Sequence, residues 1–191
     1  MSGEYVSKPR ICHGWLQGVA HCPSPNADQR PGGEQPSLLV IHNISLPPGC
    51  FGGSEIIDLF TNRLDCGAHP FFREIEGLRV SAHLLIDRHG AVTQFVSFLD
   101  RAWHAGVSNF DGRERCNDFS IGIELEGTDT VPYTDAQYRV LARITQALMR
   151  AYPAIEPQRI CGHSDIAPGR KTDPGEAFDW PRYRSLLAVQ G

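Results

Sequence analysis

A continuous apolar run, SLLVI at residues 37–41, constrains the fold of this chain more than any other segment. A run without polar alternation is typical of a strand buried on both faces, as occurs where helices cover both sides of a sheet. Residues 79–87 and 91–96 indicate two further strands joined by a turn at His89 and Gly90. The sequence therefore predicts a sheet that contains a buried strand.

Two more segments favour strands. SIGIELE, residues 120–126, alternates, so its three large apolar residues would face one side and Gly122, Glu124 and Glu126 the other. On the residues alone, the two glutamates could also form a charge pair facing water on an edge strand. Residues 158–161 indicate a short strand further along the chain.

Amphipathic patterns predict helices. Ser54 can cap a helix that extends to about Leu64. Thr134 and Gln137 have the spacing of a capping box, which would open the longest helix, ending near Tyr152. The predicted inward side chains are Ile56, Ile57, Phe60 and Leu64 in the first helix and Tyr138, Leu141, Thr145 and Leu148 in the second.

A final helix is predicted to start at Asp179, because Trp180 and Pro181 follow it and proline is tolerated in a first helical turn. Residues 1–36, rich in Pro, Gly, Asn and Asp, predict an irregular lead-in packed on the domain that residues 37–191 form. The predicted fold is one α/β domain, a mixed central β-sheet with helices packed on it.

Charge and hydrophobicity exclude several functions. The formal net charge is −4 and Lys and Arg form no run, so binding to a phosphate backbone has little electrostatic support. No stretch reaches the roughly 18 apolar residues of a membrane span, and residues 1–10 lack the apolar core of a signal peptide. We therefore expect a cytoplasmic protein with neither nucleic acid nor membrane as a partner, and reduced thiols at its six cysteines.

The stretch GHSDIAPGRKTDPG, residues 162–175, concentrates groups that can do chemistry. If its centre is extended, Lys171 and Asp173 point to the same side. His163 begins this loop, and His42 follows the apolar run at residues 37–41. Two histidines and one carboxylate from separate segments form a common catalytic zinc set, which leaves a fourth position for water.

Each of these residues also has a purely structural interpretation. A histidine at a strand end, such as His42 or His163, can be a hydrogen-bonded structural group. Asp173, which precedes a Pro-Gly pair, can be a turn residue, and Lys171 can be a solvated loop charge. Spacing alone therefore leaves the metal site open.

Five motifs appear together in the order found in one family of enzymes. They are SLLVIHNIS at 37–45, RVSAH at 79–83, AWHAG at 102–106, NDFSIGIELEG at 117–127 and the GHSDIAPGRKTDPG loop. The chain resembles the AmpD-type N-acetylmuramoyl-L-alanine amidases, a branch of the fold shared by phage lysozyme-amidases and peptidoglycan recognition proteins. The resemblance extends from about Pro23 to the C-terminus.

The resemblance implies a role for each matching residue. His42, His163 and Asp173 would bind a single zinc ion, with Asp173 at a place where many relatives in the wider fold carry Cys. Glu124 would be the general base, although the strand pattern alone does not choose between the two glutamates. Lys171 would be the cation near the scissile carbonyl.

Further positions follow from the same resemblance. Asn43, Arg79 and Arg115 match residues that line the substrate groove, where an arginine fork would suit the carboxylates of a muropeptide. His83 and His104 are expected to pack or to support the ligands without binding zinc themselves. The implied enzyme is a cytoplasmic monomer that hydrolyses the lactyl-L-alanine amide of 1,6-anhydro-N-acetylmuramyl peptides, small molecules recovered in peptidoglycan recycling, and thereby limits β-lactamase induction.

Other functions have less support. A muropeptide-binding module without zinc would not need the complete set of five site residues. An exported or phage-type amidase acting on intact wall is disfavoured by the missing signal peptide and wall-binding repeats. A serine hydrolase would need a G-x-S-x-G motif, which is absent, and Gly169 to Thr172 lack the glycine spacing of a phosphate-binding loop.

Overall fold

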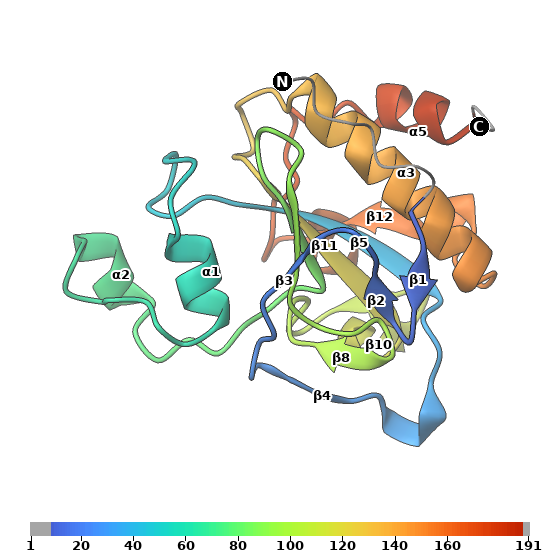
Figure 1. Cartoon of the computed structure of the whole chain (residues 1–191), viewed down its shortest axis with the longest axis horizontal. Helices are drawn as coiled ribbons and strands as arrows, with labels where there is room; N and C mark the ends of the chain where they lie inside the picture. Colours follow the sequence, from blue (N-terminus) through green and yellow to red (C-terminus); the bar gives the residue numbers. More distant parts are fainter. Residues whose placement is uncertain (1–8, 189–191) are drawn as a thin grey trace.

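The computed structural model describes residues 9–188, and its centre is a six-stranded sheet (Figure 1). Neighbouring strands are, in order, β12 (Ile160–Gly162), β5 (Leu38–Ile44), β11 (Ser120–Glu126), β6 (Leu84–Ile86), β7 (Val92–Gln94) and β3 (Ala20–His21). The first four are parallel to one another, whereas β7 is antiparallel to β6. The predicted mixed sheet is therefore confirmed.

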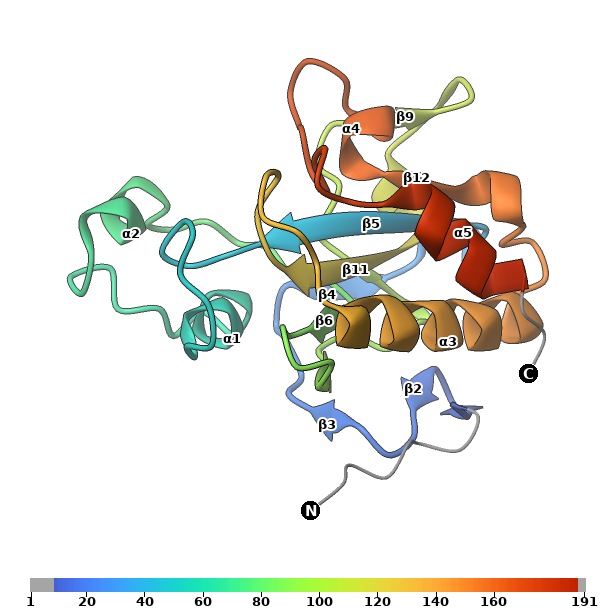
Figure 2. The same cartoon turned by 90° about the horizontal axis from the view of Figure 1, so that it is seen from above.

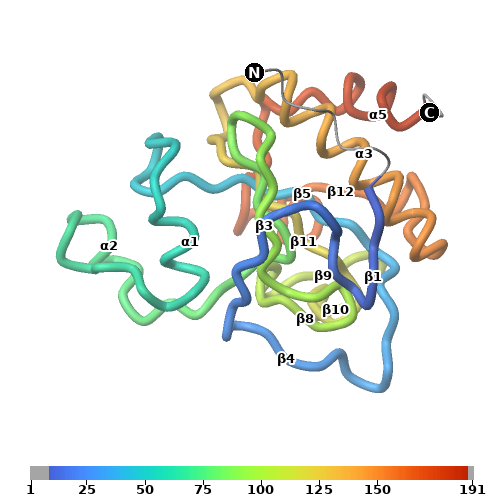
Figure 3. The backbone as a smooth tube through the Cα atoms, in the orientation of Figure 1, coloured from blue at the N-terminus to red at the C-terminus, as the bar shows by residue number. Residues whose placement is uncertain are grey.

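Short strands also occur outside the main sheet. β1 (Ile11–Cys12) pairs with β2 (Trp15–Leu16), β4 (Ala27–Gln29) with β8 (Asp100–Ala102), and β9 (Asn109–Phe110) with β10 (Arg113–Glu114). In Figure 3 the blue N-terminal trace passes β3 and β4 before the chain enters β5. The described part of the segment expected to be irregular, residues 9–36, thus contains four strands, each too short to produce a periodic pattern in the sequence.

Five α-helices lie within residues 9–188. α3 (Asp135–Ala151) packs against α5 (Trp180–Ala188), while α1 (Glu55–Phe60) and α2 (Pro70–Glu74) lie beyond the carboxyl ends of β5 and β11 (Figures 1 and 2). α4 (His163–Ile166) follows β12 directly. The predicted capping box of α3 is confirmed, its four predicted inward side chains are buried, and the predicted final helix is α5.

The helix predicted from Ser54 to about Leu64 is shorter than expected. It ends at Phe60, and Asn62 then adopts the left-handed region, with φ of 60°. Ser54 does not cap the helix through its side chain, because its hydroxyl donates to the carboxylate of Asp58 at 2.8 Å.

Strand boundaries also differ from the predictions. The strand expected at residues 79–87 is confined to β6, and the one expected at 91–96 is confined to β7. The strand expected at 158–161 is shifted to β12, because a 3-10 turn, η3 (Pro157–Arg159), occupies the residues before it.

The two faces of the sheet are covered by different cores. Leu39 and Ile41 of β5 pack in the cluster that includes side chains of α3 and α5. Leu38 and Val40 pack on the other face, with side chains of α4 and of η2 (Cys116–Asp118). All four are fully buried, which confirms burial on both faces. Because side chains alternate along a strand, His42 lies on the face opposite α3 and α5.

β11 is an interior strand, lying between β5 and β6. Glu124 and Glu126 are only 8% and 3% exposed, so the interpretation as a charge pair facing water on an edge strand is wrong. Glu124 and His42 are register partners on parallel strands, and both glutamates therefore share the face of His42.

Residues 1–8, which belong to the segment used to predict that a signal peptide is absent, lie outside the described residues, as do residues 189–191. Within residues 9–188, no helix is both long enough and apolar enough to span a bilayer. The six cysteines, predicted to be reduced thiols, are all unpaired.

Candidate metal centre

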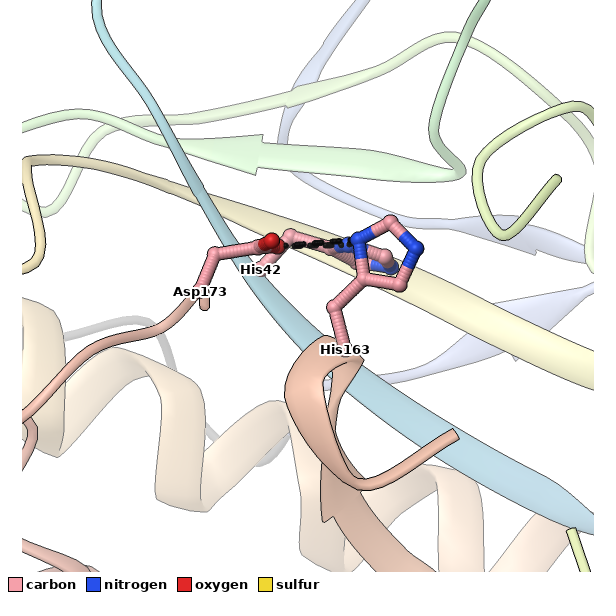
Figure 4. A group of neighbouring side chains, drawn as sticks. All are labelled: His42, His163 and Asp173. Carbon is pink, nitrogen blue, oxygen red and sulfur yellow. Dashed lines mark hydrogen bonds and ion pairs between the residues drawn. The ribbon is translucent and has the colours of Figure 1, made fainter. Parts of the chain in front are cut away.

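Three segments bring the predicted zinc ligands together on one face of the sheet (Figure 4). His42 lies near the carboxyl end of β5, and His163 is the first residue of α4, immediately after β12. β12 pairs with β5 in a register that sets Gly162 opposite Ile41, so the residues that follow, His163 and His42, reach the same level. Asp173 enters from the loop that follows α4.

The potential ligand atoms form a small triangle. The Nδ1 atoms of His42 and His163 are 3.0 Å apart, and each lies 3.1 Å from Oδ2 of Asp173. Tetrahedral coordination with zinc bonds of about 2.0–2.1 Å places ligand atoms about 3.3 Å apart. The triangle therefore fits one zinc ion after a small expansion, and among residues 9–188 it is the only cluster of this kind.

Burial and hydrogen bonds together shift the pKa values of His42 and Asp173. Burial lowers the pKa of His42 to about 4, with the hydrogen bond to Asp173 acting in the opposite direction. Burial alone would raise the pKa of Asp173, but the hydrogen bonds with His163 and His42 hold it well below its usual range. A neutral imidazole and an ionised carboxylate are the forms that bind zinc.

The loop that carries Asp173 is held against α4 and β12. The amide of Ser164 donates to the carbonyl of Asp173 at 3.0 Å, and the hydroxyl of Tyr133 donates to the carbonyl of Pro174 at 2.7 Å. A Cβ added at Gly162 would lie 2.7 Å from Cδ of Pro174, so glycine permits the loop to approach the strand.

Glu124 stands beside the triangle with an unused oxygen. Its Oε2 is buried without a hydrogen-bond partner. Burial raises its pKa well above the usual range and the charge of Asp173 adds to this, while the charge of Lys171 has the opposite effect. Glu126 differs, because its carboxylate accepts from the amides of Gly52 and, at 3.1 Å, Arg88. Of the two glutamates, Glu124 is thus the one with a buried, unpartnered carboxylate oxygen.

Lys171 is exposed, and its charge reaches the centre, since it lowers the pKa of both His42 and Glu124. The preceding residue, Arg170, fixes the loop by donating to the carbonyls of Ala105 and Val107 at 2.6 and 2.7 Å. Asp173 belongs to the centre itself, whereas Lys171 acts on it only through its charge, so the expectation that both side chains enter one site stays a prediction.

The predicted substrate residues occupy different surroundings. Asn43 follows His42 in β5, and its amide donates to Asp129 at 2.8 Å. Arg115 is exposed on a cleft of about 550 Å³, which Arg170 also lines. Arg79 is exposed between α2 and β6. The structure therefore places Arg115 beside the loop of Lys171, whereas Arg79 comes from a separate segment.

His83 and His104 are both buried on the same side of the sheet as the triangle. Nδ1 of His83 accepts from the amide of Gly122 at 3.0 Å, and burial lowers its pKa to about 3. His104 contacts a ligand directly, with its Nδ1 2.9 Å from Nε2 of His42. Neither residue belongs to the triangle of ligand atoms.

Sequence reasoning missed several supporting residues, among them Tyr133, Arg170 and Ser120. The hydroxyl of Ser120 lies 3.1 Å from Nε2 of His104. One signal was present in the sequence, because a glycine inside a strand often marks the close approach of another group. That glycine is Gly122, where an added Cβ would lie 2.5 Å from the His104 ring.

Comparison with known families places this geometry in a class. Residues 32–176 match the family described as N-acetylmuramoyl-L-alanine amidase, a span that includes the three ligand candidates, Glu124 and Lys171. The chain therefore belongs to the N-acetylmuramoyl-L-alanine amidase family.

Individual relatives place the chain in the AmpD-type branch of that family. It is 64% identical, over 92% of its length and 94% of the relative, to the 1,6-anhydro-N-acetylmuramyl-L-alanine amidase AmpD of Salmonella typhimurium strain SL1344. A crystal structure of a selenomethionine AmpD derivative matches with a TM-score of 0.91 and 61% identity, covering 93% of this chain and 98% of that one. AmpDh3 from Pseudomonas aeruginosa, in complex with anhydromuramic pentapeptide, matches at 29% identity and a TM-score of 0.58, covering 82% and 61%.

Proposed function

We propose that this chain is a zinc-dependent amidase that cleaves the bond between the lactyl group of N-acetylmuramic acid and L-alanine in 1,6-anhydro-muropeptides. The observation that carries the proposal is the largely buried triangle of His42, His163 and Asp173, with the unpartnered Oε2 of Glu124 beside it. Because two imidazoles and one carboxylate leave a coordination position open, this donor set suits a catalytic rather than a structural zinc.

The amide is slow to hydrolyse for two reasons: resonance makes its carbonyl carbon a weak electrophile, and water is a poor nucleophile. Zinc held by the triangle would supply Lewis acidity to the carbonyl and to the attacking water. Glu124 would take a proton from that water and deliver it to the leaving amine of L-alanine. Its raised pKa suits this exchange, since the group must both accept and release a proton.

Lys171 would stabilise the oxyanion of the tetrahedral intermediate. Its position supports this role, because its charge already acts on His42 and Glu124. Its neighbour Arg170 holds the loop through two backbone carbonyls, which limits the movement of Lys171 relative to the triangle.

The proposed substrate rests on the AmpD-type relatives and on the arginine in the cleft. The name of the Salmonella relative specifies a 1,6-anhydro-N-acetylmuramyl substrate, and AmpDh3 was crystallised with an anhydromuramic pentapeptide. Arg115 lines the cleft of about 550 Å³ beside the loop of Lys171, where its guanidinium can pair with a carboxylate of the peptide stem. Asn43 and Arg79 are proposed as further substrate contacts.

We further propose that the enzyme acts as a monomer in the cytoplasm, on muropeptide fragments recovered during peptidoglycan recycling, and so limits β-lactamase induction. The AmpD-type family is what supports this setting. Cell fractionation tests the location, and accumulation of anhydro-muropeptides after deletion of the gene tests the role in recycling.

The direct test is an assay of purified protein of known metal content on anhydro- and non-anhydro-muropeptides and on whole sacculi. We expect zinc-dependent release of a peptide that begins with L-alanine, fastest from the soluble anhydro substrate. Binding of the fragments without cleavage would indicate a non-catalytic binding module. Faster digestion of sacculi would indicate an amidase acting on intact wall.

A further inference from the structure

The two candidate histidine ligands are contacted, on the ring nitrogens that face away from the triangle, by two consecutive residues. Nε2 of His42 lies 2.9 Å from Nδ1 of His104, and Nε2 of His163 lies 3.1 Å from the carbonyl oxygen of Ala105. The Nδ1 atoms of both ligands point into the triangle. A single dipeptide, His104-Ala105, therefore touches both imidazoles from outside.

The contact with Ala105 favours one tautomer of His163. A carbonyl oxygen only accepts, so the bond forms when Nε2 of His163 carries the hydrogen, and Nδ1 then faces the metal position instead of donating to Asp173. A neutral imidazole has one N–H, which leaves the lone pair of Nδ1 free to bind a metal. The carbonyl of Ala105 thereby selects the ligand atom of His163.

The contact with His104 can do the same for His42. Nε2 of His104 is 3.1 Å from the hydroxyl of Ser120, so it can donate there while Nδ1 accepts from Nε2 of His42. The reverse direction would place the hydrogen of His42 on Nδ1 and block metal binding. Gly122 makes room for this ring, because an added Cβ would lie 2.5 Å from its Cγ and Nδ1.

One side-chain atom anchors the dipeptide. Oδ1 of Asn117 accepts from the amide of His104 at 3.1 Å and from the amide of Ala105 at 2.8 Å. Asn117 lies in η2, and its own carbonyl accepts from the buried guanidinium of Arg30 at 3.1 Å. The anchor therefore belongs to a fixed part of the structure and touches neither ligand.

We propose that the His104-Ala105 dipeptide, anchored by Oδ1 of Asn117, is an outer bracket that orients both histidine ligands with Nδ1 toward the metal. His104 and Asn117 are thus positioning residues. The inference rests on the proposed zinc site and adds to it the residues that set which ring nitrogens bind. Groups that orient metal ligands in this way typically contribute about 10–100-fold to metal affinity.

The test measures zinc affinity by competition with a chelator, together with the visible absorption of the cobalt-substituted protein, which reports ligand geometry. Asn117→Ala removes the acceptor, and we expect zinc to bind about 10–100-fold more weakly with an altered cobalt spectrum. Asn117→Asp keeps an oxygen at the Oδ1 position, so its zinc affinity should fall by less than the roughly 10-fold that marks the lower end of the usual loss for such a group.

A second pair of variants addresses the histidine and does not depend on Asn117→Ala folding. His104→Asn keeps an acceptor near the position of Nδ1, whereas His104→Leu removes it. We expect His104→Leu to lose more zinc affinity than His104→Asn, although both lose the contact with Ser120. Thermal unfolding of the chelated proteins verifies that each variant is folded.

Two results would overturn the inference, and they are distinguishable. If folded Asn117→Ala and His104→Leu proteins have wild-type zinc affinity and an unchanged cobalt spectrum, the bracket does not orient the ligands, although the zinc site itself stands. If the wild-type protein binds no zinc, both the proposed function and the proposed bracket are wrong.

Discussion

His42 and Glu124 are register partners on the adjacent parallel strands β5 and β11. Partners in a parallel ladder point to the same face of the sheet, so a candidate metal ligand and a candidate proton carrier are held side by side by the backbone pairing itself. Neither group is on a loop, and this rigid pairing fixes the relative position of the two chemical functions.

Removing a ligand should remove both metal and activity. We expect His42→Ala and Asp173→Ala to lose bound zinc, because two donors remain where a catalytic zinc needs three. Metal analysis of the purified variants and a muropeptide assay measure the two losses. His89→Ala is the matched control, since His89 is exposed and is not one of the residues of the centre. This variant should keep both its zinc and its activity. A fully active, zinc-free His42→Ala protein would contradict the assignment.

Glu124→Gln should separate binding from turnover. The variant keeps the three ligands and should retain zinc, but without a group to move the proton we expect kcat to fall by about 10²–10⁴. Glu126→Gln is the control, because Glu126 shares the same face but bonds the amides of Gly52 and Arg88. Stopped or continuous assays of peptide release give kcat for both. An equal loss of kcat in the two variants would show that the choice between the glutamates is wrong.

Lys171→Met should change both the rate and its pH dependence. Loss of a donor to the oxyanion lowers kcat by about 10²–10³. The charge of Lys171 also lowers the pKa of Glu124, so its removal raises that pKa. Since Glu124 acts as a base only when ionised, activity falls as the pH drops through its pKa, and the acid limb should move to higher pH in the variant. If kcat/KM falls in the variant but the acid limb of its pH profile does not move, the charge of Lys171 does not act on the pKa of Glu124.

The main strands and the long helix were predictable from the sequence because each of these produces a local pattern, whereas the side chains that meet at the centre followed from the family resemblance, since spacing alone left the metal site open. The apolar run predicted burial on both faces of β5, and the alternation in β11 predicted that Glu124 and Glu126 share a face. The pattern could not separate the two glutamates, because the difference between them lies in what approaches each carboxylate from other segments.

The residues that support the centre could not be predicted either, because their contacts also come from other segments of the chain. Gly122 signals that some group comes close to the strand, but not that the group is the ring of His104. The bonds of Asn117 to the dipeptide of His104 and Ala105 depend on a loop whose course leaves no periodic trace in the sequence. The short strand β3 was missed because two residues carry no period.

The buried histidines predict how the stability of the metal-free protein depends on pH. Burial lowers the pKa of His83 to about 3 and lowers that of His104 well below its usual value of 6.5. Between about pH 3 and pH 6.5 the unfolded chain binds a proton at position 83 that the folded protein does not, and His104 acts in the same direction, so the free energy of unfolding must fall as the pH falls. Such a histidine contributes up to about 1.4 kcal/mol per pH unit, once the unfolded imidazole is almost fully protonated.

Urea unfolding in the presence of a chelator, at several values between pH 7 and pH 5, measures this slope. His83→Asn keeps an acceptor for the amide of Gly122 but does not titrate, so its slope should be smaller, by about 1.4 kcal/mol per pH unit near pH 5. His89→Asn changes an exposed histidine and should leave the slope as it is in the wild type. If His83→Asn has the wild-type slope, the histidine at position 83 is not the group whose protonation opposes folding.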